Sequence, residues 1–105
     1  MRYGYLATMG TKPGHRDDLV KILLRGENGL RSAGCELYVV GHAESDPDTV
    51  WVYEVWRSKA HHDASLALPE TRAAIAGAIP LLSGERTGQE LLIAGGLGLP
   101  AEPRT

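Results

Sequence analysis

The strongest constraint on the fold is a run of strand-forming residues that is apolar on both of its faces. Residues 50–57 read Val-Trp-Val-Tyr-Glu-Val-Trp-Arg, and β-branched and aromatic residues of this kind favour strands. Successive side chains point to opposite sides of a strand, which gives two faces: Val50, Val52, Glu54 and Trp56 on one, and Trp51, Tyr53 and Val55 on the other. Neither face is polar enough to lie in water, so both sides of the sheet must be covered.

The segments before this run predict a strand and a helix. Residues 2–9 mix aromatic and small apolar types and precede a cluster of turn residues at 10–14. Apolar residues then recur at helical spacing, which predicts a helix over residues 15–32. Gly26 and Gly29 lie inside this helix, and each costs about 1 kcal/mol relative to Ala, so we expect its second half to be bent or frayed.

The other segments complete a simple order of elements. Residues 35–42 are rich in strand formers and are joined to 50–57 by polar turn residues, which predicts an antiparallel hairpin. A short helix follows over 59–67, and a second one, opened by a proline, over 69–82. Residues 89–94 form the last predicted strand. The order is β-α-β-β-α-β with a broken second helix, the split βαβ arrangement.

These elements predict an α+β fold with a ferredoxin-like antiparallel sheet and helices on one face. We expect one domain over residues 1–94 and a Gly- and Pro-rich tail over 95–105. A chain of 105 residues is too short for two domains, so it has no second layer of its own for the other face of the sheet. We therefore expect a second copy of the chain to cover that face, making a homodimer.

Composition and charge exclude several classes of protein. A formal net charge of −2 without a basic cluster argues against nucleic acid as a partner, and no apolar stretch approaches the length of a membrane span. Cys35 is the only cysteine, so neither a disulfide nor a cysteine-based zinc site can form within the chain. His61 and His62 are adjacent rather than three or four residues apart, which disfavours a metal site. These features predict a cytoplasmic protein without a bound metal.

Four stretches of the chain resemble one known family. They are the turn Thr-Lys-Pro-Gly at 11–14, the Gly-Cys step at 34–35, the block Tyr-Glu-Val-Trp-Arg-Ser-Lys-Ala-His at 53–61, and Leu-Pro-Glu-Thr at 68–71. Together they resemble the antibiotic biosynthesis monooxygenases, which include quinol monooxygenases. The Glu-x-Trp-x-Ser block before a helix is the most specific of them.

The resemblance implies a dimeric α/β barrel with a pocket in each subunit between sheet and helices. It further implies a cofactor-independent monooxygenase that acts with molecular oxygen on a small aromatic, quinol-like or polyketide substrate, using neither metal nor flavin. Trp56 matches the pocket tryptophan of the family. Ser65 stands where the quinol monooxygenases have a helical histidine, so the substrate can differ. The haem-degrading branch is a poorer match, because Ala7 and Ile75 stand where that branch has an asparagine and a haem-binding histidine.

Oxygenation without a cofactor needs an apolar pocket that excludes water and a group that accepts a proton near neutral pH. The candidate catalytic residues are His42, His61 and Tyr53. Either His61 or its neighbour His62 can line a pocket beside the helix that carries them. The candidate substrate-binding residues are Trp56, Tyr38, Arg72 and Ile75.

Two other functions fit the same residues. The fold alone does not imply chemistry, so the chain can be a ligand-binding or dimerisation module without catalytic activity. It can also be an isomerase or a cyclase that uses the same pocket.

Overall fold

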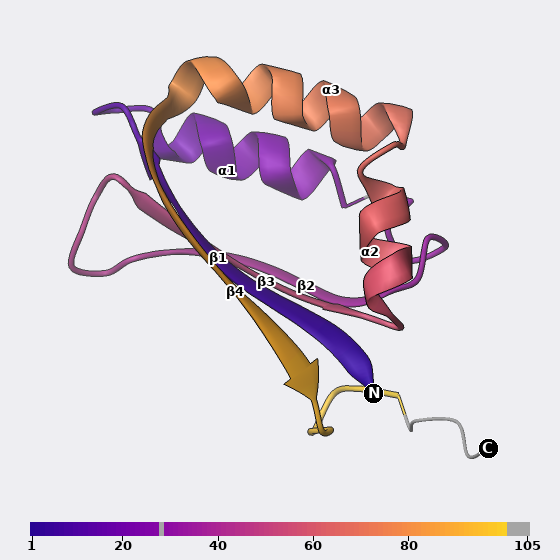
Figure 1. Ribbon diagram of the computed structural model, residues 1–105. Helices are drawn as coiled ribbons and strands as arrows, with labels where there is room; N and C mark the ends of the chain where they lie inside the picture. The colour runs from indigo at the N-terminus through magenta and orange to yellow at the C-terminus, as the bar shows by residue number, and fades with distance from the viewer. Residues whose placement is uncertain (28, 101–105) are drawn as a thin grey trace.

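Strands and helices alternate along the chain in the predicted order (Figure 1). The computed structural model describes residues 1–27 and 29–100. Its strands are β1 (Arg2–Thr11), β2 (Cys35–His42), β3 (Thr49–Trp56) and β4 (Leu82–Ile93). Its helices are α1 (Arg16–Arg25), α2 (Lys59–Ser65) and α3 (Pro69–Ala78), and a short 3-10 turn (Ile79–Leu81) joins α3 to β4.

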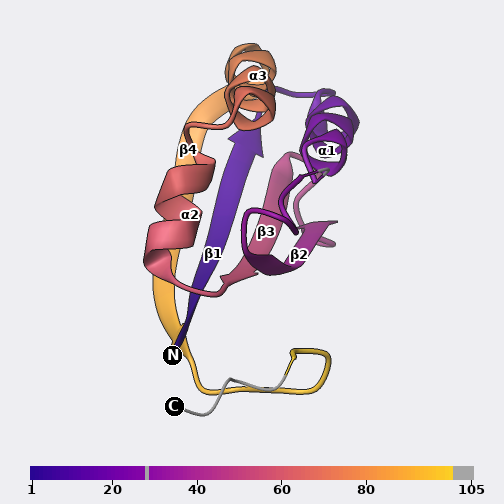
Figure 2. The ribbon, with the colours of Figure 1, turned by 90° about the vertical axis from the view of Figure 1, so that its right-hand side faces the viewer.

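The strands form one antiparallel sheet in the order β2-β3-β1-β4. Strand β1 lies in the middle and pairs with β3 on one side and β4 on the other, with Tyr3 opposite both Trp56 and Leu92. The helices all lie on one face of the sheet (Figure 2). The predicted α+β, ferredoxin-like architecture is confirmed.

The main core lies where α1 and α3 pack on this face. Leu19 of α1 is completely buried and packs with Val50 and Val52 of β3 and with Ala78 of α3. Helix α1 lies over β2 and β3, and α3 lies beside it toward β4 (Figure 2). Helix α3 thus lies on the β4 side of the helical layer.

The first helix is shorter than predicted. It ends at Arg25 rather than near residue 32, and turns occupy the described residues between it and β2. Gly29 has a φ of 88°, in the left-handed region that interrupts a right-handed helix. The glycines therefore end the helix, rather than bending it.

The last strand is longer than predicted. It begins at Leu82 rather than at residue 89, although residues 82–88 contain two glycines and few strand formers. The free edge of β1 supplies the reason, because β1 continues as far as Thr11, which pairs with Leu82 across a register shift. Backbone pairing with a long neighbour outweighs the weak local preference.

The described part of the tail packs against the outer face of the sheet, away from the helices (Figure 1). Val55 on that face is fully buried, and residues 94–97 and Leu99 lie around it. Arg2 fixes this segment, since its buried guanidinium donates hydrogen bonds to the Glu36 carboxylate and, at 2.5 Å, to the carbonyl oxygen of Pro100. The remaining predicted tail residues, 101–105, lie outside the described part.

The rest of the outer face is uncovered. Trp51 in β3 and Val39 in β2 are neighbouring exposed side chains, since Val39 pairs with Tyr53, two residues along from Trp51. The tail thus supplies a partial cover that the sequence did not predict, and an apolar area remains beside it. No helix in the described part of the chain is long and apolar enough to cross a bilayer. The cytoplasmic location stays a prediction.

Candidate functional site

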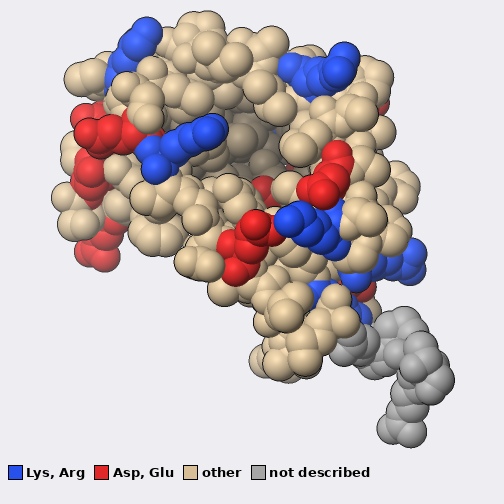
Figure 3. Space-filling model, viewed as in Figure 1, with Lys and Arg blue, Asp and Glu red and all other residues tan. Residues whose placement is uncertain are grey.

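A hollow opens on the helical side of the sheet, below α3 and beside α2 (Figure 3). Alternation along the strands places Tyr3 and Tyr5 of β1, and Glu54 and Trp56 of β3, on this side. His62 of α2 lies against three of these side chains. Tyr3, Tyr5, Glu54, Trp56 and His62 form one cluster on this side of the sheet, and we refer to the space beside this cluster as the site hollow.

Helix α2 turns His62 toward the sheet. The Ser58 hydroxyl caps the helix by accepting a hydrogen bond from the His61 backbone N–H. His62 and the buried Ser65 lie on the same face of α2, because residues three apart on a helix are neighbours. The His62 ring centroid lies 5.2 Å from that of Tyr3 and 5.8 Å from that of Tyr5. An edge-to-face contact with Trp56, at 5.7 Å, completes an aromatic setting around the imidazole.

The neighbour of His62 fixes which ring nitrogen is free. His62 Nδ1 lies 2.9 Å from Oδ1 of Asp63. An ionised carboxylate can only accept a hydrogen bond, so Nδ1 carries the proton. In the neutral imidazole Nε2 is then an acceptor with a lone pair. His62 therefore presents a base on the side of its ring away from Asp63.

Glu54 and Trp56 form a buried pair beneath the histidine. Trp56 Nε1 donates a hydrogen bond of 2.9 Å to Oε1 of Glu54. Burial raises the pKa of Glu54 above its usual range, while the indole hydrogen bond and the charge of His62 act in the opposite direction. Trp56 is only 1% exposed, so it acts here as a packing and hydrogen-bonding residue.

The tyrosines beside the hollow are held in their protonated form. Burial, and then a hydrogen bond to Glu90, raise the pKa of Tyr3 to about 12. Burial likewise raises the pKa of Tyr38, whose hydroxyl donates to the carbonyl oxygen of Leu23 at 3.2 Å. These groups can donate hydrogen bonds near neutral pH but cannot serve as bases there.

The Tyr5 ring lies over Gly88, which has no side chain to block it. A Cβ atom at Gly88 would lie 2.1 Å from the Tyr5 hydroxyl oxygen and 2.8 Å from its Cζ. Only glycine lets the Tyr5 ring lie across β4 in this way. The hydroxyl of Tyr5 therefore sits at the β4 side of the site hollow.

The three predicted catalytic residues are not brought together. His61 Nδ1 lies 2.6 Å from the Ser58 hydroxyl, and the ring packs over Gly34, whose φ is 106°. His42 is exposed at the end of β2. Tyr53 alternates with Glu54 and Trp56, so it lies on the outer face of the sheet.

The predicted substrate-binding residues fall into two groups. Trp56 and Tyr38 lie on the helical side of the sheet, and both pack in the cluster that contains Tyr3. Arg72 and Ile75 are exposed on α3. The buried residue of α3 is Ala78, so Ile75 does not pack into the core.

Sequence reasoning missed His62 as the histidine that lies at the hollow. Adjacent residues on a helix point about 100° apart, so only one of His61 and His62 can face the sheet. A helix as short as α2 carries too few apolar positions to show which. Ser65, three residues after His62, is buried on the same face, but nothing in the sequence marks this serine as buried.

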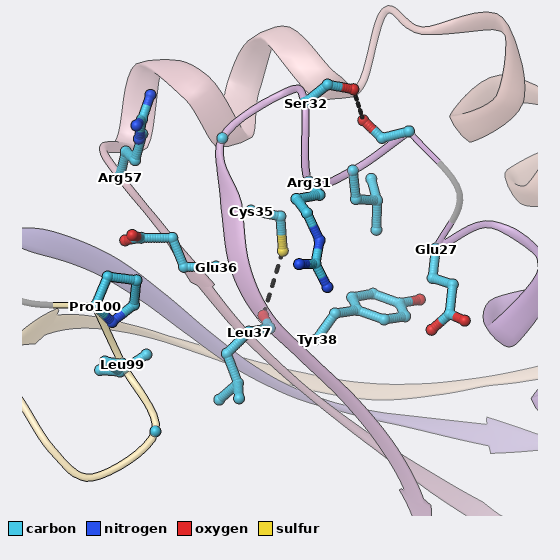
Figure 4. A pocket seen from close by; sticks show the side chains of 14 residues that line it. Glu27, Arg31, Ser32, Cys35, Glu36, Leu37, Tyr38, Arg57, Leu99 and Pro100 are labelled. Carbon is cyan, nitrogen blue, oxygen red and sulfur yellow. Dashed lines mark hydrogen bonds between the residues drawn. The ribbon is translucent and has the colours of Figure 1, made fainter.

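A second concavity, of about 1190 Å³, lies along the free edge of β2 (Figure 4). Arg31 and Arg57 line it on opposite sides of β2, and Tyr38 is the one aromatic side chain among the described residues that line it. Cys35 in its wall donates to the carbonyl oxygen of Leu37 at 3.3 Å, and burial raises the pKa of its thiol to about 11. The described residues that line it include the carboxylates of Glu27 and Glu36 but no histidine, so we place the candidate site at the site hollow.

The described residues contain no group of three or more His, Cys, Asp or Glu side chains arranged to hold a metal ion. The base at His62 and the buried acid at Glu54 are the chemical groups of the site hollow. Such a pair can accept and return a proton beside an aromatic ligand.

Comparison with known proteins gives consistent relatives. Solved structures similar to this chain include a provisionally named antibiotic biosynthesis monooxygenase from Chloroflexus aurantiacus J-10-fl. It is 39% identical with a TM-score of 0.86, covering 95% of this chain and 100% of that one. A similarly named protein from Nitrosomonas europaea is 13% identical with a TM-score of 0.80, covering 91% and 90%. One from Caulobacter crescentus CB15 is 20% identical with a TM-score of 0.78, covering 86% and 87%.

The last two similarities show the fold alone, because sequence identities of 13% and 20% are too low to indicate a shared function. Comparison with curated proteins found no match to this chain. The sequence profile of the antibiotic biosynthesis monooxygenases matches residues 2–77, which include β1 to β3, α2 and the side chains of the site hollow. The chain therefore belongs to the antibiotic biosynthesis monooxygenase family.

Proposed function

We propose that this chain is a cofactor-independent monooxygenase that oxidises a small aromatic, quinol-like or polyketide substrate with molecular oxygen. The observation that carries the proposal is the His62 imidazole, which has its Nδ1 held by Asp63 and its ring set among Tyr3, Tyr5 and Trp56. A base enclosed by aromatic rings suits a phenol or an enol. Family membership supports the same class of reaction.

The reaction begins with a proton transfer. His62 Nε2 takes the proton of the bound phenol or enol, and Asp63 stabilises the imidazolium that results. The substrate anion gives one electron to oxygen, and the two radicals join to form a carbon–oxygen bond. The resulting peroxide breaks its O–O bond and loses water. In an anthrone-like substrate a CH₂ group and O₂ thus become C=O and H₂O, and in a hydroquinone an aromatic CH and O₂ give a hydroxyquinone and H₂O. His62 returns the proton to the departing oxygen.

The other side chains of the site hollow have supporting roles in this proposal. Trp56 lies beneath His62 and is a positioning residue, while Tyr3 packs against the His62 ring and donates its hydroxyl hydrogen to Glu90. Glu54, whose pKa burial raises, accepts the Trp56 indole hydrogen bond and so fixes the tryptophan beneath His62. The enclosing rings limit the access of water to the peroxide.

An oxygen electrode tests the proposal directly. We expect oxygen uptake with at least one member of a panel of hydroquinones and anthrone-like phenols, with one oxygen consumed per product and with added chelator having no effect. Binding of these compounds without oxygen uptake would replace the proposal with a ligand-binding module. Conversion of a substrate under argon would replace it with an isomerase or a cyclase.

We also propose that the chain works as a homodimer whose subunits meet through the outer face of the sheet. The support is the apolar area at Val39 and Trp51, which the tail leaves exposed. Light scattering should give about twice the chain mass of 11.3 kDa. Trp51→Glu should place a charge in this interface and give a monomer.

A matched variant separates the interface from general surface hydrophobicity. Leu24 on α1 is 44% exposed, the same as Trp51, but lies on the helical layer. We expect Leu24→Glu to leave the mass of the dimer unchanged. A wild-type monomer at micromolar concentration, or an equal response of both variants, would reject this interface.

A further inference from the structure

One flank of α3 carries exposed apolar and basic side chains instead of packing on its neighbour. Cβ atoms placed on Gly26 and Gly77 would lie 3.6 Å from Ala74 and Ile22 respectively, so the opposite flank of α3 faces α1. Ile75 and Ile79 are 45% and 62% exposed, and with Arg72 they follow helical spacing on the flank turned away from α1. Because α3 lies on the β4 side of α1, this flank turns toward the side on which the hollow opens (Figures 2 and 3).

A second arginine rises from β4 below this flank. Arg86 pairs with Met9, which packs in the core under the helices, so the Arg86 side chain lies on the helical side of the sheet. Two residues further along β4 is Gly88, the position over which the Tyr5 hydroxyl lies. Helix α3 and β4 are joined by one short turn and run back along each other, so Arg72 and Arg86 flank the same opening.

The acidic side chains near this opening are already engaged or point elsewhere. Glu90 pairs with Lys59 at 2.9 Å and accepts from Tyr3, and Asp63 binds His62. Glu70 is four residues before Ala74, on the flank that faces α1, and Glu85 alternates onto the outer face. Within the described part of the chain, no ion pair or side-chain hydrogen bond joins Arg72 or Arg86 to an acid. Figure 3 shows basic side chains on two sides of the hollow.

We infer that the substrate of the site hollow is an aromatic molecule with an anionic substituent, such as a carboxylate, which Arg72 and Arg86 bind at the opening. The Tyr5 hydroxyl donates a third hydrogen bond from the floor, while Ile75 and Ile79 cover the apolar part of the molecule. Guanidinium groups suit this task, because they bind carboxylates through charge-assisted hydrogen bonds. The inference rests on the proposed function, since it names the substrate class of the same site.

The test compares an acid with its neutral ester under argon, so that binding is measured without turnover. Titration calorimetry with 2,5-dihydroxybenzoate and its methyl ester supplies the pair. We expect the acid to bind about tenfold more tightly than the ester, and each of Arg72→Gln and Arg86→Gln to weaken binding of the acid by about tenfold. Binding of the ester should change by less than about twofold, the response of a contact that carries no charge.

Lys21→Gln is the matched control, because it removes one exposed positive charge from α1 away from the opening. It should leave the preference for the acid intact. Equal binding of acid and ester, no measurable binding of the acid, or an equal loss in all three variants would overturn the inference. Arginine-dependent binding of the acid without oxygen uptake would uphold it and reject the oxygenase. Equal oxygen uptake with acid and ester would uphold the oxygenase and overturn the inference.

Discussion

His62→Gln should lower kcat for oxygen uptake by about 10²- to 10⁴-fold, the range that a positioned general base contributes. Glutamine is polar and close in size, so the contacts with Tyr3 and Tyr5 are largely kept, while the group that takes the proton is lost. The measurement is steady-state oxygen uptake together with the thermal midpoint. The midpoint should change little, because the side chain is replaced within a partly polar environment.

His61→Gln distinguishes a specific base from a general effect on α2. His61 is adjacent in sequence but packs over Gly34 and bonds Ser58 outside the site hollow, so kcat should stay within a few-fold of the wild type. Asp63→Asn should have an intermediate effect, because an amide can donate to Nδ1 and so favour the wrong tautomer. Full activity of His62→Gln, or its loss in His61→Gln, would reject His62 as the base.

Trp56→Phe should lower the free energy of unfolding by about 2–6 kcal/mol. Replacing the indole with a smaller ring leaves a cavity that costs about 1–3 kcal/mol, and the buried Glu54 oxygen loses its donor, which costs about as much again. For a domain of this size each kcal/mol corresponds to about 4–8 °C in the thermal midpoint. Urea unfolding and thermal melting measure the effect.

The deficit of Trp56→Phe should grow as the pH rises. Glu54 has a folded-state pKa above its unfolded value, so folding loses stability as the pH rises from the unfolded value through the folded one. Without the indole donor the folded pKa rises further, and the cost of ionisation increases. At a pH low enough to protonate Glu54 in both states, only the cavity cost remains.

Glu54→Gln in the same background checks this assignment. Because glutamine cannot ionise, the double variant should lose the pH-dependent part of the deficit and keep the cavity part. A deficit that is independent of pH in both backgrounds would show that the Trp56 hydrogen bond does not govern Glu54. A midpoint unchanged by Trp56→Phe would contradict the packing role altogether.

The order of elements and the hairpin of β2 and β3 followed from local patterns, because strong strand formers and turn residues lie next to each other in the sequence. The length of β4 did not follow, because residues 82–88 are weak strand formers that are ordered by the edge of β1. The sequence predicted a bent or frayed second half for α1, whereas the helix ends at Arg25 and Gly29, in the left-handed region, keeps it from continuing. Local propensity predicted these elements only where tertiary pairing did not override it.

For the candidate site, the strand pattern correctly placed Trp56 and Glu54 on one face and Tyr53 on the other. The strand pattern does not show how the helices pack on the sheet or how distant strands are registered. Nothing in the sequence indicates that His62 faces inward and His61 outward, since the choice depends on how α2 sits on β1 and β3. The position of Tyr5 over Gly88 depends on the register between β1 and β4, strands that are separated by most of the chain.

The central position of β1 has a consequence for how this chain acquires its structure. Because β1 pairs with β4, the first strand keeps one edge open until Leu82–Ile93 has been synthesised. Pairings between segments so distant in sequence require the closure of a long loop, which makes folding slow relative to that of helical domains of the same size. During synthesis the exposed edge of β1 is a surface on which other unfinished chains can pair and aggregate. Yield in cells should therefore depend on the rate of translation and on chaperones more strongly than the stability of the finished fold would indicate.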